Sequence, residues 1–307
     1  MKNILITKIF TVAFTFTVST VSNFSLLAQF GGGQGTQTNP YQIYTKQHLD
    51  ELADSVANSP SNNTTTGYNW SRDKHFKVMN DITNPVTRMI GTFQPRFSFQ
   101  GNFDGQNNTI TVNINETINY FVGLFGCVYS GSIKNVVVTG SINAMSTVSE
   151  VGIVGIIVTG TPASDDVKIS NCINSADIVS NYCCGGIVGS ITTIFTMNNK
   201  VVEVIIENCT NIGTVKGKAT AGGILSNIIT GILGVCIINN CINDGLIDGN
   251  YVVGGIAGYI NDKATISGCF NGGVVSGNGV VGCIVGIKET GATVINNHYD
   301  MQMCNEE

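Results

Sequence analysis

The sequence is poor in charged residues. Only 11% of its 307 residues are Asp, Glu, Lys or Arg, against about 25% in an average soluble protein. Helical and coiled-coil chains are rich in Ala, Glu, Lys and Leu, and disordered chains carry more net charge with fewer Ile and Val, so both classes are excluded. The net charge of −5 argues against a nucleic-acid partner, since such proteins are usually basic. By contrast, 37 Gly and 35 Asn residues indicate a β-rich chain with many turns.

Groups that bind metals or activate nucleophiles are also scarce. His48, His75 and His298 are the only three histidines and are far apart in the sequence. No Cys-x-x-Cys pair occurs, and the His-Glu-x-x-His motif of zinc proteases and the Gly-rich phosphate loop are absent. We therefore expect no metal-binding or cofactor-binding residues and no cofactor.

Carboxylates are the more serious test for an enzyme, because parallel β-helices often host polysaccharide lyases and glycosidases. The acidic residues between 121 and 300 are scattered, and Asp244 and Asp248, close together and on neighbouring turns, are the candidate pair. Lys216 and Lys218 are the nearest basic pair. We interpret these charges as solvated loop residues, so no catalytic residue is assigned and the chain is expected not to be an enzyme.

Residues 1–28 have the pattern of a signal peptide. Lys2 and Lys8 precede an apolar, hydroxyl-rich stretch over 9–21, which is too short to span a bilayer well. We expect cleavage between Ala28 and Gln29 and export of the chain; an N-terminal anchor helix is the alternative. The apolar stretch 224–242 contains Ser and Asn, which are costly in lipid, so no membrane span is expected after removal of the signal.

Six repeat units occupy residues 121–300. Each contains a Gly-apolar-Gly block, whose second position falls at 123, 152, 186, 223, 255 and, as Cys, at 283. An Ile-x-Asn-Cys motif follows at 169–172, 206–209 and 238–241, with variants at 133–136, 266–269 and 295–298. One unit is too short to bury an apolar face, whereas stacked units bury a continuous one. The pattern predicts an all-β, right-handed parallel β-helix (β-solenoid) of about six stacked coils with an N-terminal capping helix.

The Ile-x-Asn-Cys motif predicts a bend in each coil. Ile and Cys would point to opposite faces of a straight strand, so a bend at Asn, which tolerates the left-handed conformation, is needed to turn both inward. Stacked Asn side chains are then expected to bond along the axis; Asn that only marks exposed loops is the alternative. Cys172, Cys209, Cys241 and Cys269 are expected to form an inward row of free thiols, with His298 in the same position of the last unit. Disulfides, which ten cysteines in an exported protein suggest, are the alternative.

Residues 29–120 are interpreted as an N-terminal cap with the first irregular coils. A helix is predicted over 45–58, with Thr45 as its N-cap and Leu49, Leu52, Ala53 and Val56 on one face. Residues 76–82 are predicted to form a strand and 103–105 a turn. A separate folded domain is the alternative for this segment, and residues 301–307 are assigned to a C-terminal tail.

The chain resembles the bacterial GLUG-repeat family over about residues 30–300. The resemblance is carried by the Gly-rich segment with Asn39-Pro40-Tyr41, by Phe103-Asp104-Gly105, by Gly-Leu-Phe-Gly at 123–126, and by the repeated Gly-Gly-Ile-Val-Gly and Asn-Cys-x-Asn motifs. It implies an exported or cell-surface bacterial protein. GLUG repeats also occur beside an immunoglobulin-cleaving zinc protease domain, but this sequence lacks the peptidase part. The chain is then either a short member or a fragment of a longer reading frame.

These observations favour a secreted or cell-surface protein with a structural or adhesin-like role as a rigid rod. Its expected partner is a surface glycan or protein of unknown identity, and the rod is expected to be monomeric. A carbohydrate-active enzyme on a β-helix is the alternative from another class. An inert spacer within a larger surface protein is the third possibility.

Overall fold

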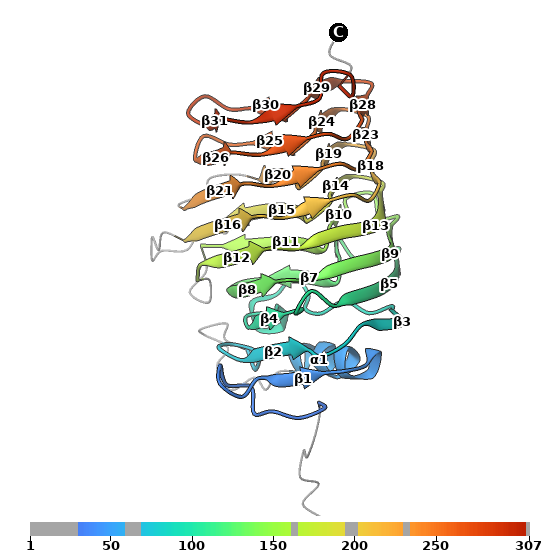
Figure 1. Cartoon of the computed structure of the whole chain (residues 1–307), viewed down its shortest axis with the longest axis vertical. Helices are drawn as coiled ribbons and strands as arrows, with labels where there is room; N and C mark the ends of the chain where they lie inside the picture. The colour runs from blue at the N-terminus through green and yellow to red at the C-terminus, as the bar shows by residue number, and fades with distance from the viewer. Residues whose placement is uncertain (1–29, 59–68, 161–164, 194–201, 230–233, 305–307) are drawn as a thin grey trace, which may run out of the picture.

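The computed structural model describes residues 30–58, 69–160, 165–193, 202–229 and 234–304 (Figure 1). The predicted signal peptide and its cleavage site at Ala28 and Gln29 lie outside these residues. Each repeat unit winds once around the axis and contributes strands to four sheets. It adds one strand to each sheet, except that the later units add two short strands to the fourth. Neighbouring strands pair in parallel, so the predicted β-solenoid is confirmed.

The four sheets are named here in the order in which one coil visits them. Sheet I contains β6 (Phe121–Val122), β10 (Glu150–Val151), β14 (Cys183–Gly185), β19 (Thr220–Gly222), β24 (Val252–Gly254) and β29 (Val280–Gly282). Sheet II contains β7 (Phe125–Val128), β11 (Val154–Thr159), β15 (Val188–Thr193), β20 (Leu225–Ile229), β25 (Ala257–Ile260) and β30 (Val285–Lys288).

Sheets III and IV are longer, because the N-terminal segment also contributes strands to them. Sheet III contains β1 (Tyr41–Ile43), β2 (His75–Val78), β4 (Asn102–Asp104), β8 (Gly131–Lys134), β12 (Val167–Ser170), β16 (Glu203–Glu207), β21 (Val235–Asn239), β26 (Ala264–Ser267) and β31 (Thr293–Ile295). Sheet IV contains β3 (Ile82–Val86), β5 (Thr109–Glu116), β9 (Val137–Ala144), β13 (Ile173–Ser180), β17 (Thr210–Asn211), β18 (Val215–Gly217), β22 (Ile242–Asn243), β23 (Ile247–Gly249), β27 (Phe270–Asn271), β28 (Val275–Gly277) and β32 (His298–Tyr299).

Sheet III runs without interruption from β1 to β31, so the N-terminal segment continues the same stack (Figure 1). The prediction of a turn at 103–105 is wrong in part. Asn102–Asp104 is strand β4, and Phe103 is fully buried in register with Ile133. An inward row of apolar side chains then continues up the sheet through Ile169, Ile206, Ile238 and Ile266.

The predicted bend between sheets III and IV is confirmed. Five coils have a left-handed backbone at the predicted position, with φ between +51° and +63°: Asn135, Asn171, Asn208, Asn240 and Gly268. In the last coil the left-handed residue is Asn296, with φ +55°, one residue before the predicted Asn297. These are the non-glycine residues that best tolerate this conformation, with Gly as the one substitute. Side-chain bonding at this position joins Asn171 to Asn135 at 3.2 Å and Asn135 to Asp104 at 2.9 Å.

A continuous ladder of buried amides lies three residues further along, which the sequence analysis did not anticipate. Asn174, Asn211, Asn243 and Asn271 are fully buried. In Asn174, Asn211 and Asn243, Nδ2 donates to the Oδ1 of the Asn in the next coil, at 2.8, 2.7 and 2.7 Å. All four amides also donate to the carbonyl two residues ahead in their own chain, at 3.0 to 3.2 Å. The first three amides can be buried because both of their amide hydrogens have a partner.

The Gly-Gly blocks and the amide ladder explain each other. A Cβ at Gly186, Gly223 or Gly255 would lie 2.5 to 2.6 Å from the Cγ of a ladder Asn, so only glycine fits there. In the last coil Tyr299 takes the ladder position opposite Asn271. The matching block position is then Cys283, which forms a disulfide with Cys304.

The predicted row of free thiols is also confirmed for Cys172, Cys209, Cys241 and Cys269, all buried. Each thiol donates to the carbonyl two residues before it, at 3.3 to 3.5 Å. The placement of His298 in this row is wrong by one residue, because the register sets His298 beside Phe270. Asn297 fills the place instead, accepting from the Cys269 N–H at 2.8 Å.

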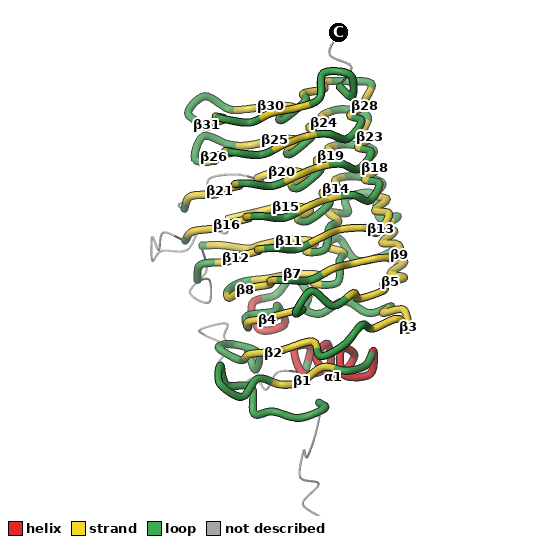
Figure 2. Tube along the Cα trace, in the orientation of Figure 1, coloured by secondary structure: helices red, strands yellow, loops and turns green. Residues whose placement is uncertain are grey.

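The helix predicted at the N-terminal end is α1 (Lys46–Ala57), and Thr45 accepts a hydrogen bond from the His48 N–H as its N-cap. Its apolar face is buried through Leu49, Leu52, Ala53 and Val56. Together with the short 3₁₀ helix η1 (Pro95–Phe97), it lies at the N-terminal end of the stack (Figure 2). No helix in the described ranges has the length and apolar character that crossing a bilayer requires.

The C-terminal end is held by a disulfide between Cys283 and Cys304, with Cα atoms 5.5 Å apart. The tail folds back so that Cys304 forms a parallel bridge with Val275, and the Val275 N–H donates to Met303 O at 2.9 Å. Closing a loop of 21 residues should stabilise this last coil by roughly 3 kcal/mol.

We predict that Asn243→Ala lowers the free energy of unfolding by about 3 kcal/mol, because several buried hydrogen-bond partners lose their mate. Urea denaturation followed by circular dichroism measures the change. Asn278→Ala is the control, since Asn278 is exposed at a corner, and it should cost less than about 0.5 kcal/mol. Equal effects of the two substitutions would contradict a structural role for the ladder.

The cysteine assignment predicts a thiol count. The denatured, unreduced protein should show eight reactive thiols, and reduction should release the two of Cys283 and Cys304. Titration with a chromogenic disulfide reagent in guanidinium measures both numbers. Ten thiols before reduction, or markedly fewer than eight, would disprove the assignment.

Candidate functional site

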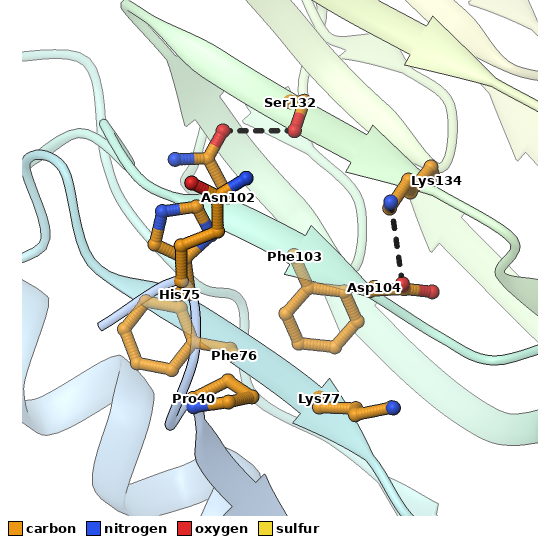
Figure 3. Close-up of a pocket in the computed structure, with 10 residues that line it drawn as sticks. Pro40, His75, Phe76, Lys77, Asn102, Phe103, Asp104, Ser132 and Lys134 are labelled. Carbon is orange, nitrogen blue, oxygen red and sulfur yellow. Dashed lines mark hydrogen bonds and ion pairs between the residues drawn. The ribbon is translucent and has the colours of Figure 1, made fainter. Parts of the chain in front are cut away.

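The outer face of sheet III near its N-terminal end carries two rows of polar side chains. Alternation along β2, β4 and β8 points Phe76, Phe103 and Ile133 inward and their neighbours outward. The register aligns the outward residues as His75–Asn102–Ser132 and Lys77–Asp104–Lys134. Three strands that lie far apart in sequence therefore present six polar groups on one surface (Figure 3).

These rows line a groove of about 300 Å³, here called the N-terminal groove, to which Gln37 and Pro40 also contribute. The chain before β1 folds over one side of it, and the Gly35 carbonyl accepts from the His75 N–H at 2.9 Å. This turn requires glycine at position 33, where φ is +88° and a Cβ would lie 1.8 Å from the Pro40 oxygen. The groove volume is at the lower end of the range of small-ligand sites.

Asp104 is fully engaged within the groove. Its Oδ1 accepts from Asn135 Nδ2 at 2.9 Å and from the Gln106 N–H at 3.0 Å, and Lys134 Nζ lies 3.4 Å from Oδ2. Partial burial raises the pKa of Asp104, but these hydrogen bonds and the charge of Lys134 outweigh it and hold the pKa below its usual value. Asp104 therefore stays ionised and neutralises Lys134.

The remaining donors of the groove are open to a ligand. Ser132 Oγ donates to Asn102 Oδ1 at 2.9 Å, which leaves the Asn102 amide hydrogens directed outward. Within the described ranges, the half-buried side chains of Lys77 and His75 form no hydrogen bond or ion pair. The groove thus offers one unneutralised cation beside amide, hydroxyl and imidazole groups. Sequence analysis missed it, because no motif marks an outward residue in an irregular coil.

Of the four charged residues considered for an enzyme site, the structure brings Asp248, Lys216 and Lys218 together and places Asp244 apart from them. Asp248 is in register with Lys216 and accepts from Ser276 Oγ at 3.4 Å. Asp248, Lys216 and Lys218 line a second groove of about 410 Å³ at the corner of sheets IV and I. Asp244 lies outside it, in the exposed turn after β22. This groove therefore holds one of the two carboxylates rather than the pair that glycoside hydrolysis requires.

A buried acid lies elsewhere, at the start of β10. Glu150 is only 5% exposed and stands in register between Phe121 and Cys183. Burial raises its pKa to about 8, and its Oε2 has no hydrogen-bond partner. Cys183 accepts from Asn227 Nδ2 at 3.6 Å, and burial raises the pKa of its thiol to about 11. A protonated acid beside a protonated thiol does not provide the thiolate that nucleophilic attack requires.

No group of three metal-ligating side chains is found in the described ranges.

Comparison with known proteins supports the fold more than a function. No family model matches the chain. The chain is 32% identical to a proposed Gly-rich membrane protein of Evansella cellulosilytica over 121 residues. The matched segment covers 36% of this chain and 12% of that relative. The chain thus spans about an eighth of the relative's length. Its structure resembles a proposed immunoglobulin A1 protease from Bacteroides ovatus, with a TM-score of 0.67 and 21% identity, over 90% of this chain and 79% of that one. At this identity the likeness shows the fold alone.

Glu150 predicts a specific pH dependence of stability. Its folded pKa of about 8 exceeds the ordinary 4.5, so the folded state is favoured at low pH and loses stability as pH rises from about 5 to about 8. Glu150→Gln should remove this slope and raise the free energy of unfolding at pH 8 by ~2–4 kcal/mol relative to the wild type. Urea denaturation at pH 5 and pH 8 measures it. The exposed Glu203→Gln is the control, and an unchanged slope in Glu150→Gln would contradict the burial of an uncompensated acid.

Proposed function

We propose that this chain is an exported GLUG-repeat protein that acts as a structural or adhesin-like rod at the bacterial cell surface. Sheet III carries the proposal, because nine strands continue one another from the capped N-terminal end to the last coil. A stack of this kind presents fixed side chains on long, regular faces, which suits contact with an extended partner. The resemblance in part to a proposed Gly-rich membrane protein supports a location in the cell envelope.

The contact surface in this proposal is the N-terminal groove. Its side chains are held by three hydrogen-bonded strands, and it contains donors not used by the fold. The alternative of a carbohydrate-active enzyme is less favoured. Asp104 in this groove is committed to Asn135, Gln106 and Lys134, and Asp248 in the second groove lacks a partner carboxylate among its lining residues.

Protease accessibility on intact native cells tests the location. An antibody against the solenoid should stain intact cells, and added protease should remove that signal while a cytoplasmic marker stays intact. We expect the mature chain to start near Gln29. A full-length, uncleaved chain that stays in the cytoplasm would contradict the proposal, and release of reducing sugar from a polysaccharide by the purified chain would favour the enzyme.

A further inference from the structure

We propose that the N-terminal groove binds an acidic saccharide, whose carboxylate or sulfate group contacts Lys77 while its hydroxyl groups contact Asn102 and Ser132. The inference deepens the proposed function by naming the ligand class of the same groove, and it rests on that function. It follows from the charges, the polar groups and the floor of the groove.

The charge balance of the groove favours an anion. Lys134 lies 3.4 Å from Asp104, and that carboxylate also accepts two further hydrogen bonds. Lys77 stands in register with Asp104 on the other side. No ion pair holds Lys77 in the part of the chain that the structure describes, and its side chain is half-buried. A partly desolvated ammonium without a counter-charge binds an anionic group more strongly than a fully solvated lysine does.

The polar groups beside Lys77 suit hydroxyls. Asn102 and Ser132 are already oriented by their mutual hydrogen bond of 2.9 Å, so each presents its remaining donor or acceptor capacity in a fixed direction. His75 lies next to Asn102 in the same row and adds a further polar group (Figure 3). Preorganised donors and acceptors of this kind bind polyols at low entropic cost.

The floor of the groove disfavours a peptide. Phe76 and Phe103 lie beneath the polar rows but are only 1% and 0% exposed, so they offer no apolar pocket for side chains. Peptide recognition commonly combines backbone pairing with such pockets. The backbone groups of β2 and β4 are occupied by the parallel pairing within sheet III. A ligand that binds through polar groups alone fits better.

Binding measurements on the purified mature chain test the inference. The probes are a galacturonate oligosaccharide, a sulfated galactose oligosaccharide, the neutral galactose oligosaccharide of equal length, and poly-glutamate. Isothermal titration should show at least tenfold weaker binding of the neutral sugar, and the affinity for the acidic sugar should fall with added salt. The carboxylated and sulfated probes identify which anionic group is preferred.

Three variants locate the site, each checked for an unchanged unfolding transition. Lys77→Gln should weaken binding of the acidic sugar at least tenfold, while Lys77→Arg should retain it. Lys263→Gln, which removes the same charge from an exposed turn outside both grooves, should bind like the wild type.

Four outcomes would overturn the inference: equal binding of the neutral sugar, tighter binding of poly-glutamate, no effect of Lys77→Gln, or absence of any saccharide binding. If no saccharide binds but the chain is exposed on intact cells in the accessibility test, the ligand inference fails and the proposed surface role is retained.

Discussion

Buried side-chain amides stacked along the axis set the register on which the rest of the fold depends. Parallel coils repeat at about 4.8 Å, a spacing at which one Asn amide reaches the next, as the bonds of 2.7 to 2.8 Å between Asn174, Asn211, Asn243 and Asn271 show. A one-residue slip of any coil would move its Asn out of the row and leave the amides of the neighbouring coils without a partner. The ladder therefore penalises wrong registers more than an apolar row would.

The glycine blocks are a consequence of this ladder. Gly223 and Gly255 pack against Asn243 and Asn271 with no space for a Cβ, which brings sheet I close to sheet IV. Where the ladder stops, the constraint is released, and Cys283 replaces glycine and forms the disulfide that secures the tail. The abundance of Gly and Asn thus reflects one packing arrangement repeated along the chain.

Much of the fold could be predicted from the repeats, because a position that recurs in every unit reports its own environment. The left-handed bend at Asn171 and its equivalents and the free thiol row were predicted in this way and are confirmed. Helix α1 lies outside the repeats and was predicted from its N-cap and the spacing of its apolar residues, and it is confirmed as well. The predicted position of His298 failed, because the last unit has an extra Asn and pattern matching alone could not choose between Asn296 and Asn297. The disulfide of Cys304 depends on a tail that lies outside the repeats.

The candidate site was less accessible to sequence analysis. The side chains of the N-terminal groove come from β2, β4 and β8, two of which belong to irregular coils that share no motif with the repeats. Lys77 and Asp104 become neighbours only through strand register. The burial of Glu150 could not be predicted from the sequence either. Its side chain is buried because the coils stack it between Phe121 and Cys183.

The amide ladder is tested most directly by hydrogen exchange of Asn side chains, followed by NMR on protein labelled selectively at Asn. If the ladder sets the register, the Nδ2 protons of Asn174, Asn211, Asn243 and Asn271 exchange far more slowly than those of the exposed Asn278. Equally rapid exchange at all five residues would contradict the account.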